Sequence, residues 1–209
     1  MRSKLFIVST LLWGWHLFAS PDDFLQKYVD MERRIAQYYN LDRGIFRAVV
    51  EAESVFNRYA LLIRSTRPQK LSRFLENNGV PYKKNRKFFS IFPKDRRSAE
   101  LCYNQIFGTE KALKSFGVID YDAGLMQINK SNFSKYGLDK EYYLDFSKNM
   151  IAGGYILKDC FEWAKRFGRR WSVIYGIECY NKGTNVKKID LLGYGYAKKV
   201  LRNYARIVK

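Results

Sequence analysis

The sequence predicts a compact, mainly α-helical domain that carries one long basic insertion. Of its 209 residues, 47% are hydrophobic and 17% are aromatic, which is enough for one core and too much for a disordered chain. Most apolar residues recur at helical spacing, whereas those of residues 61–120 do not. The chain is too short for two full domains with linkers. It has no internal repeat, low-complexity run or heptad pattern, so a solenoid, a collagen and a coiled coil are excluded.

Residues 1–19 have the pattern of a secretory signal, which leaves residues 20–209 as the mature domain. Two basic residues precede an uncharged, mostly apolar run over residues 5–19, shorter than the roughly 20 residues of a membrane span. Cleavage after Ala19 would place Leu17 where a small residue is preferred, so an uncleaved anchor and a buried helix are the alternatives. We expect the signal to be removed, no stable membrane span to remain, and the protein to act in the periplasm or cell envelope.

The formal charge of +18 points to an anionic partner. Nucleic acid, a membrane surface and an acidic polymer are the three candidates. Removal of the signal takes away two basic residues and no acidic one, which leaves +16. Because an exported protein rarely meets DNA, we expect envelope polymers or lipid, and no nucleic acid, as partners.

Few residues of the mature chain are suited to hold a metal. The cysteines at 102, 160 and 179 lack the spacing of a metal motif, and the only histidine, His16, lies in the signal. A zinc site and a histidine-based triad are therefore excluded, and we expect no cofactor. At most one internal disulfide can form, and the sequence leaves all three pairings open. Any catalysis must depend on carboxylates, Tyr, Ser or Lys.

The spacing of apolar residues defines the expected helices in chain order. Asp22 and Asp42 stand where the N-caps of the first two helices are expected. The last helix has its apolar residues on one stripe. The expected helices span residues 22–39, 43–56, 148–167, 171–180 and 194–208.

Residues 61–120 form the expected insertion. They contain 13 basic and 5 acidic residues, a net charge of +8. Their periodicity is poor, and only short helices, such as one over residues 99–107, are expected there. Few segments of the chain alternate with period two, so little strand is expected.

The second helix contains two glutamates with different surroundings. Glu51 and Glu53 lie about 200° apart around the helix. Glu51 is one turn from Arg47 and two turns from Arg58, so we expect a solvated, paired side chain. Glu53 shares its face with apolar residues, and burial raises the pKa of a carboxyl. Such an acid can protonate a leaving oxygen near neutral pH; the alternative is a local hydrogen-bonding role in the core.

Four short blocks extend this signal. They are ESVFN at residues 53–57, GLMQIN at 124–129, NMIAGG at 149–154 and CYNKG at 179–183. In this order they resemble the soluble lytic transglycosylase (SLT) family, a goose-lysozyme-like fold that cleaves peptidoglycan. The resemblance covers roughly residues 41–60 and 121–208. The compact size and the signal are similar to those of small members that work with secretion or conjugation machines.

The resemblance implies that Glu53 is the single catalytic acid and base, and that peptidoglycan glycan strands are the substrate. It also implies cleavage of the MurNAc–GlcNAc β-1,4 bond with formation of 1,6-anhydroMurNAc. For Ser54 we favour a local cap over substrate contact, and of the tyrosines at 194 and 196 the second is the better candidate for the cleft. The residues expected to bind substrate are Ser54, Gln127, Asn129, Tyr180, Asn181 and Tyr196.

Two alternatives remain open. Asp120 and Asp122 precede Gly124, and we favour loop caps for them. If one is instead a second carboxylate that positions water, the enzyme is a hydrolytic muramidase. The other alternative is a weakly active peptidoglycan-binding assembly module on the same fold.

Some positions read as packing or depart from the family pattern. Met126 and Ile128 are expected in the core, and the Gly153–Gly154 pair in close helix packing. Lys182 and Glu178 stand where the family usually has small residues, and Lys182 either binds a stem-peptide carboxylate or is solvated. The catalytic block and the GLMQIN segment are separated by 66 residues, which the insertion largely fills.

Overall fold

The computed structural model describes residues 23–186 and 195–209. The predicted signal at 1–19, the proposed cap Asp22 and Tyr194 lie outside these residues, so the division of the chain into a signal and a mature domain stays a prediction. Among the helices that are described, none is long and apolar enough to cross a membrane.

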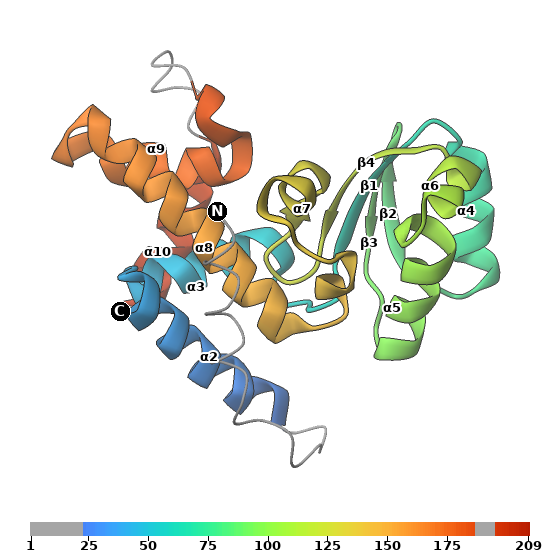
Figure 1. Cartoon of the computed structure of the whole chain (residues 1–209). Helices are drawn as coiled ribbons and strands as arrows, with labels where there is room; N and C mark the ends of the chain where they lie inside the picture. Colours follow the sequence, from blue (N-terminus) through green and yellow to red (C-terminus); the bar gives the residue numbers. More distant parts are fainter. Residues whose placement is uncertain (1–22, 187–194) are drawn as a thin grey trace.

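Five longer helices form one lobe of the molecule (Figure 1). Each corresponds to a helix predicted from the sequence, which confirms the mainly helical fold class. They are α2 (Asp23–Tyr39), α3 (Arg43–Ser54), α8 (Phe146–Ala164), α9 (Arg169–Lys182) and α10 (Gly195–Ile207). Short 3-10 turns, η3 (Lys165–Phe167) and η4 (Gly183–Asn185), follow α8 and α9.

Local sequence explains where α3 begins and how it is buried. The side chain of Asp42 accepts a hydrogen bond from the backbone nitrogen of Ile45 at 2.8 Å, as predicted for an N-cap. Phe46, Val49 and Val50 recur at helical spacing and are fully buried. The helix that carries Glu53 is therefore capped at its start and fixed by its apolar face.

The second lobe contains a five-stranded antiparallel sheet with the order β2-β3-β1-β4-β5. The strands are β1 (Leu61–Ser65), β2 (Tyr82–Asn85), β3 (Phe88–Ile91), β4 (Val118–Ala123) and β5 (Ile128–Asn129). Figure 1 shows α4 and α6 together on one side of the sheet, with α7 beside β4. The remaining elements are α4 (Pro68–Asn77), α5 (Arg96–Cys102), the π-helical turn η1 (Tyr103–Phe107), α6 (Glu110–Phe116), α7 (Lys130–Tyr136) and η2 (Lys140–Tyr143).

The expectation of little strand in residues 61–120 is wrong. The strands have only four to six residues in this range, too few for a clear period. In β2 three of the four side chains are exposed, so the sequence of this edge strand shows no apolar alternation. The short helix predicted at 99–107 is present as α5 and η1.

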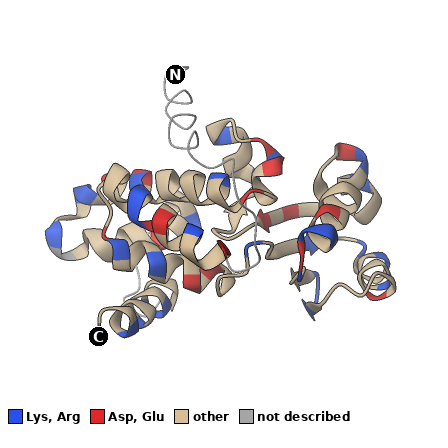
Figure 2. Cartoon of the chain, turned by 90° about the horizontal axis from the view of Figure 1, so that it is seen from below, with Lys and Arg blue, Asp and Glu red and all other residues tan. Residues whose placement is uncertain are grey.

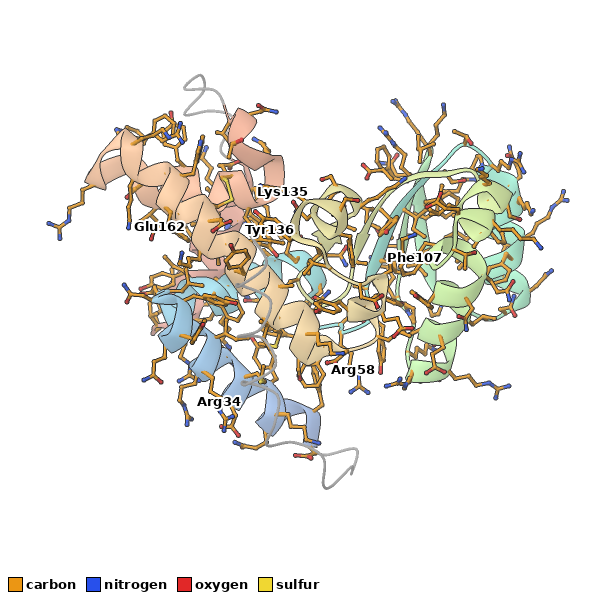
Figure 3. The ribbon with its side chains drawn as sticks, viewed as in Figure 1. Arg34, Arg58, Phe107, Lys135, Tyr136 and Glu162 are labelled. Carbon is orange, nitrogen blue, oxygen red and sulfur yellow. A yellow bond between two sulfur atoms is a disulfide. The ribbon has the colours of Figure 1, made fainter. Side chains whose placement is uncertain are left out.

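One face of the sheet is buried beneath the helices of its lobe. Ile63 pairs with Phe89 on one side and with Tyr121 on the other, and all three side chains are buried. The ring of Phe107 lies 5.1 Å from that of Tyr121, between the sheet and the lobe's helices (Figure 3). Along β1 and β4, side chains on this face are buried, and those on the other face are half-buried or exposed. This is the usual arrangement of an antiparallel sheet with one covered face.

A disulfide joins α8 and α9. Cys160 of α8 and Cys179 of α9 are bonded, with Cα atoms 5.5 Å apart. Cys102 is buried in α5 as a free thiol. Of the three pairings that the sequence left open, the structure contains the one next to Tyr180.

Close packing explains the paired glycines of α8. A Cβ at Gly153 would lie 2.6 Å from the Cβ and Cγ of Met126, and one at Gly154 would lie 2.5 Å from a methyl group of Ile35. Met126 and Ile128 are both buried. The predicted packing roles of these residues are confirmed.

Gly153→Ala should therefore destabilise the protein. The added methyl group meets a Met126 carbon that the backbone fixes, and overpacking of this kind outweighs the roughly 1 kcal/mol gained in helix propensity. We expect a net loss of about 1–2 kcal/mol in the free energy of unfolding measured with urea. Gly195→Ala, where a Cβ meets nothing within 4 Å, is the matched control and should lose nothing. Equal stability of the two variants would contradict this packing argument.

Candidate active site

Glu53 lies in the last turn of α3, against the start of α10. The hydroxyl of Tyr196 donates a hydrogen bond to its Oε1. The neighbours of Glu53 on its helix face are buried apolar residues, as the helical spacing predicted. The carboxyl is thus held between two helices by one polar contact in an apolar wall.

This environment shifts the proton affinity of Glu53. Burial, with a smaller contribution from the negative charge of Asp122, raises the pKa of its carboxyl from 4.5 to about 7. The hydrogen bond from Tyr196 and the charge of Lys199 act in the opposite direction. Glu53 can therefore both release and accept a proton near neutral pH.

Two contacts hold α10 in the position that places Tyr196 on Glu53. The ammonium group of Lys199 donates to the backbone carbonyl of Ala52. Glu178, a fully buried residue of α9, accepts a hydrogen bond from the backbone nitrogen of Ala197 at 2.8 Å. Its other carboxylate oxygen lies 2.9 Å from the ammonium group of Lys182. Glu178 thereby fixes the first turn of α10.

The charged side chains around α3 pair differently from the prediction. Glu51 is paired, as expected, but its partner is Arg206 of α10 at 2.7 Å. Arg47 instead lies 3.7 Å from Glu32, which is buried in α2. Sequence spacing within one helix cannot reveal partners on other helices. The Glu51–Arg206 pair adds one more contact between α3 and α10.

The chain leaves α3 through an uncommon turn. Val55 and Phe56 both have left-handed backbone angles, with φ of 52° and 61°. A β-branched residue in this region is strained, and Val55 is also 76% exposed. The hydroxyl of Ser54 donates to the carbonyl of Val50 at 3.3 Å, which is the local role that the sequence analysis favoured.

The GLMQIN segment forms a tight turn opposite Glu53. Gly124 has φ of 82°, and a Cβ there would lie 2.4 Å from the amide nitrogen of Asn149. That buried amide accepts from the backbone of Met126 at 2.8 Å and donates to the carbonyl of Ala123 at 3.0 Å. Only glycine fits both the angle and the close approach.

Gln127 also has a left-handed backbone angle, with φ of 44°. Its side-chain nitrogen donates to the carbonyls of Ala60 and Gly124, each at 2.8 Å. Both amide hydrogens are used in this way, so Oε1 is the atom through which Gln127 can meet a substrate. The side chain holds the turn in addition to any contact with ligand.

Tyr180 joins α9 to the same turn. Its hydroxyl donates to the carbonyl of Met126 at 2.8 Å, and burial together with the nearby Glu53 carboxyl holds its pKa well above the usual range. Tyr180 and the exposed Asn181 line a cavity of about 650 Å³ beside the turn. Asn129, Lys135, Asp159 and both disulfide cysteines also line this cavity.

The aspartates before Gly124 lie in β4 and not in a loop, so the preferred loop-cap role is wrong. Asp122 accepts a hydrogen bond from the side-chain nitrogen of Asn129 at 2.8 Å, and the same nitrogen lies 3.2 Å from Asp120. Burial raises the pKa of Asp122 from 3.8 to about 6, against the effect of this hydrogen bond. Asn129 also caps α7 through Ser131.

The structure brings together Glu53, Tyr196, Tyr180, Gln127 and Asp122. Ser54 faces back into its own helix, and Asn181 lies toward the cavity. Asn149, Glu178 and Lys199 also contribute to this arrangement, and none of them was predicted from the sequence to do so. Asn149 lies in the NMIAGG block and Glu178 departs from the family pattern, so both had a signal in the sequence, whereas no pattern marks Lys199. In the described part of the chain, no cluster of three or more His, Cys, Asp or Glu could hold a metal.

Comparison with protein-family models matches residues 30–199 to the transglycosylase SLT domain. No curated protein and no solved structure gave a significant match. The matched range contains Glu53, the GLMQIN segment, Tyr180 and Tyr196. Because the match spans most of the chain, the protein belongs to the transglycosylase SLT domain family, whose lysozyme-like members act on peptidoglycan.

Proposed function

We propose that the protein is a lytic transglycosylase that cleaves the MurNAc–GlcNAc β-1,4 bond of peptidoglycan, with Glu53 as acid and base. The observation that carries this proposal is the buried Glu53 carboxyl with a pKa of about 7 and a hydrogen bond from Tyr196. Glycoside cleavage passes through an oxocarbenium-like state and needs a proton on the leaving oxygen. A carboxyl that is partly protonated at neutral pH can supply it.

The proposed reaction uses the Glu53 carboxyl twice, first as an acid and then as a base. Glu53 protonates the glycosidic oxygen, and the bond between that oxygen and C1 of MurNAc breaks. The resulting carboxylate then accepts the proton of the C6 hydroxyl while O6 bonds to C1. The products are a 1,6-anhydroMurNAc end and a free GlcNAc hydroxyl, and Glu53 is protonated again. No water is consumed.

Other residues are proposed to position the sugar. Gln127 can accept a hydrogen bond through Oε1, and Tyr180 offers its ring, since its hydroxyl proton is already donated to Met126. Asn129 and Asn181 approach from the cavity side. Tyr196 touches the reacting carboxyl and tunes its proton affinity. Ser54, which bonds within its helix, is proposed to support the turn rather than the substrate.

Asp122 favours a second candidate function, a hydrolytic muramidase. It is a half-buried carboxyl close enough to Glu53 to raise the pKa of that group. An ionised carboxylate there could orient a water molecule toward C1 in place of the C6 hydroxyl. The same active site would then yield an ordinary reducing end.

We further propose that the protein is exported to the periplasm or cell envelope through residues 1–19 and opens the wall for a secretion or conjugation machine. The basis is the sequence pattern and the compact size of the domain. A weakly active peptidoglycan-binding assembly module is the alternative. The cleavage experiments below distinguish it from an enzyme.

Glu53→Gln should abolish clearing of purified peptidoglycan while binding persists. Loss of a general acid and base costs about 10²–10⁴-fold in rate, and glutamine keeps the size and a hydrogen-bond partner for Tyr196. Turbidity of a sacculus suspension measures cleavage, and co-sedimentation measures binding. Glu162→Gln, which removes an exposed carboxylate paired with Lys165 near the end of α8, is the control and should clear normally. Clearing by Glu53→Gln at the native rate would sink the mechanism.

The products distinguish the two candidate reactions. Mass spectrometry of digested peptidoglycan should reveal 1,6-anhydromuramoyl ends, which lack the mass of one water relative to reducing ends. A majority of reducing ends would support the muramidase. In that case Asp122→Asn should abolish cleavage, whereas a transglycosylase should retain part of its rate.

The two neighbours of Glu53 should shift its pH profile in opposite directions. Activity is expected to fall above an apparent pKa of about 7, as Glu53 loses the proton that it must donate. Tyr196→Phe removes a hydrogen bond that favours the carboxylate, so the alkaline limb of kcat/KM should move to higher pH. Asp122→Asn removes a negative charge, so that limb should move to lower pH. Shifts in the same direction would contradict the assigned electrostatics.

A further inference from the structure

The second face of the five-stranded sheet is not buried beneath the lobe's helices. Its side chains alternate with the buried Ile63, Phe89 and Tyr121, and they are half-buried or exposed. The pairing register places these side chains in two rows that cross the strands. One row is Lys83, Ser90, Leu62, Asp122 and Asn129; the other is Asn85, Phe88, Arg64 and Asp120.

Both rows start at the candidate active site. Asp122 and Asn129 of the first row are hydrogen-bonded to each other, and Asp122 acts on the pKa of Glu53. The second row starts at Asp120, which shares the amide of Asn129. The uncovered face is thus a continuous surface from the reacting carboxyl to the free edge of β2.

The charge along this surface changes sign. Its acidic residues lie in β4 beside Glu53, and its basic residues, Arg64 and Lys83, lie farther out in β1 and β2. With strands about 4.8 Å apart, Lys83 on β2 is about 14 Å from Asp122 on β4. Arg64 and Lys83 are exposed, and no carboxylate of the described residues lies within 4 Å of either. Phe88 between them is 46% exposed.

These features suit one kind of ligand. A peptidoglycan strand carries sugar rings, which pack on exposed aromatic rings, and stem peptides, which carry carboxylates. Basic residues away from the reacting acid can bind those carboxylates without disturbing the protonation of Glu53.

We propose that the uncovered face of the sheet is an extended binding surface for the peptidoglycan strand. In it, Arg64 and Lys83 bind stem-peptide carboxylates, and Phe88 packs against a sugar ring. This inference rests on the proposed function, because it takes peptidoglycan as the substrate. It assigns a role to the basic insertion: most of this surface lies within residues 61–120.

Removal of the two charges should weaken binding only where stem peptides are present. The experiment uses the chain with Glu53→Gln, so that binding is measured without cleavage. The ligands are intact sacculi and glycan strands stripped of peptides by an amidase. Arg64→Gln with Lys83→Gln should weaken binding to intact sacculi about three- to tenfold, as expected for two exposed ion pairs, and the loss should shrink at high salt. Binding to stripped strands should not change.

The control is Arg73→Gln with Lys111→Gln, which removes the same charges from α4 and α6, away from the uncovered face. It should bind both ligands like the parent chain. Phe88→Ala should weaken binding to both ligands, and Leu25→Ala, an exposed apolar residue of α2, should weaken neither. Figure 2 shows basic residues over both lobes, so a general effect of charge would appear in the control pair as well.

The outcomes separate this inference from the proposed function. Equal losses in the test pair and the control pair would overturn the inference, because only total charge would matter. Unchanged binding in the test pair would also overturn it. Failure of Glu53→Gln to abolish clearing would overturn the proposed mechanism, whereas this inference is decided by the difference between the test pair and the control pair in the same parent chain.

Discussion

The contact between Glu53 and Tyr196 is the constraint around which the active site is arranged. Glu53 ends α3, and Tyr196 begins α10, so the hydrogen bond forms only if the two helices meet at the correct depth and angle. The ion pair from Arg206 to Glu51 and the bond from Lys199 to Ala52 hold α10 along α3. Glu178 fixes the first turn of α10 from α9. Three helices thus determine the position of one carboxyl.

That arrangement reduces stability in return for reactivity. Glu53 has a pKa of about 7 in the folded protein against 4.5 for an ordinary glutamate, so its native environment favours the protonated form. The contribution of Glu53 to the free energy of unfolding is therefore most favourable below about pH 4.5. That contribution is lost as the pH rises through about 7, and the loss amounts to at most about 3 kcal/mol. The pKa of Asp122 is also raised by the folded structure, by a smaller amount, so its effect on stability has the same sign. Packing in the core of the five longer helices must offset the stability that is lost at both carboxyls.

The helices and the proposed catalytic carboxyl were predictable because both depend on spacing within one helix. Glu53 was distinguished from Glu51 by its apolar neighbours alone. Contacts between different elements were not predictable. The pairing of Arg206 with Glu51, the bond from Lys199 to Ala52 and the bond from Asn129 to Asp122 exist only in the folded chain. The strands of the insertion were missed because β2 is an exposed edge strand of four residues and β1 is only five residues long. Short elements in a sheet are stabilised by their neighbours, which local sequence does not contain.

The insertion is not an appendage of the catalytic domain. Its first strand, β1, follows the turn after Glu53, and its last strand, β4, leads into the GLMQIN segment. The ESVFN and GLMQIN blocks are far apart in the sequence, but the direct pairing of β1 with β4 brings them together in space. This pairing helps to set the position of Gln127 relative to Glu53. The same register that delivers Asp122 to Glu53 places Arg64 one strand away from Asp120. A change in the pairing of β1 with β4 by one residue would turn Asp122 to the buried face and Tyr121 toward Glu53. The chemistry of the site and the outer basic surface therefore depend on one strand pairing.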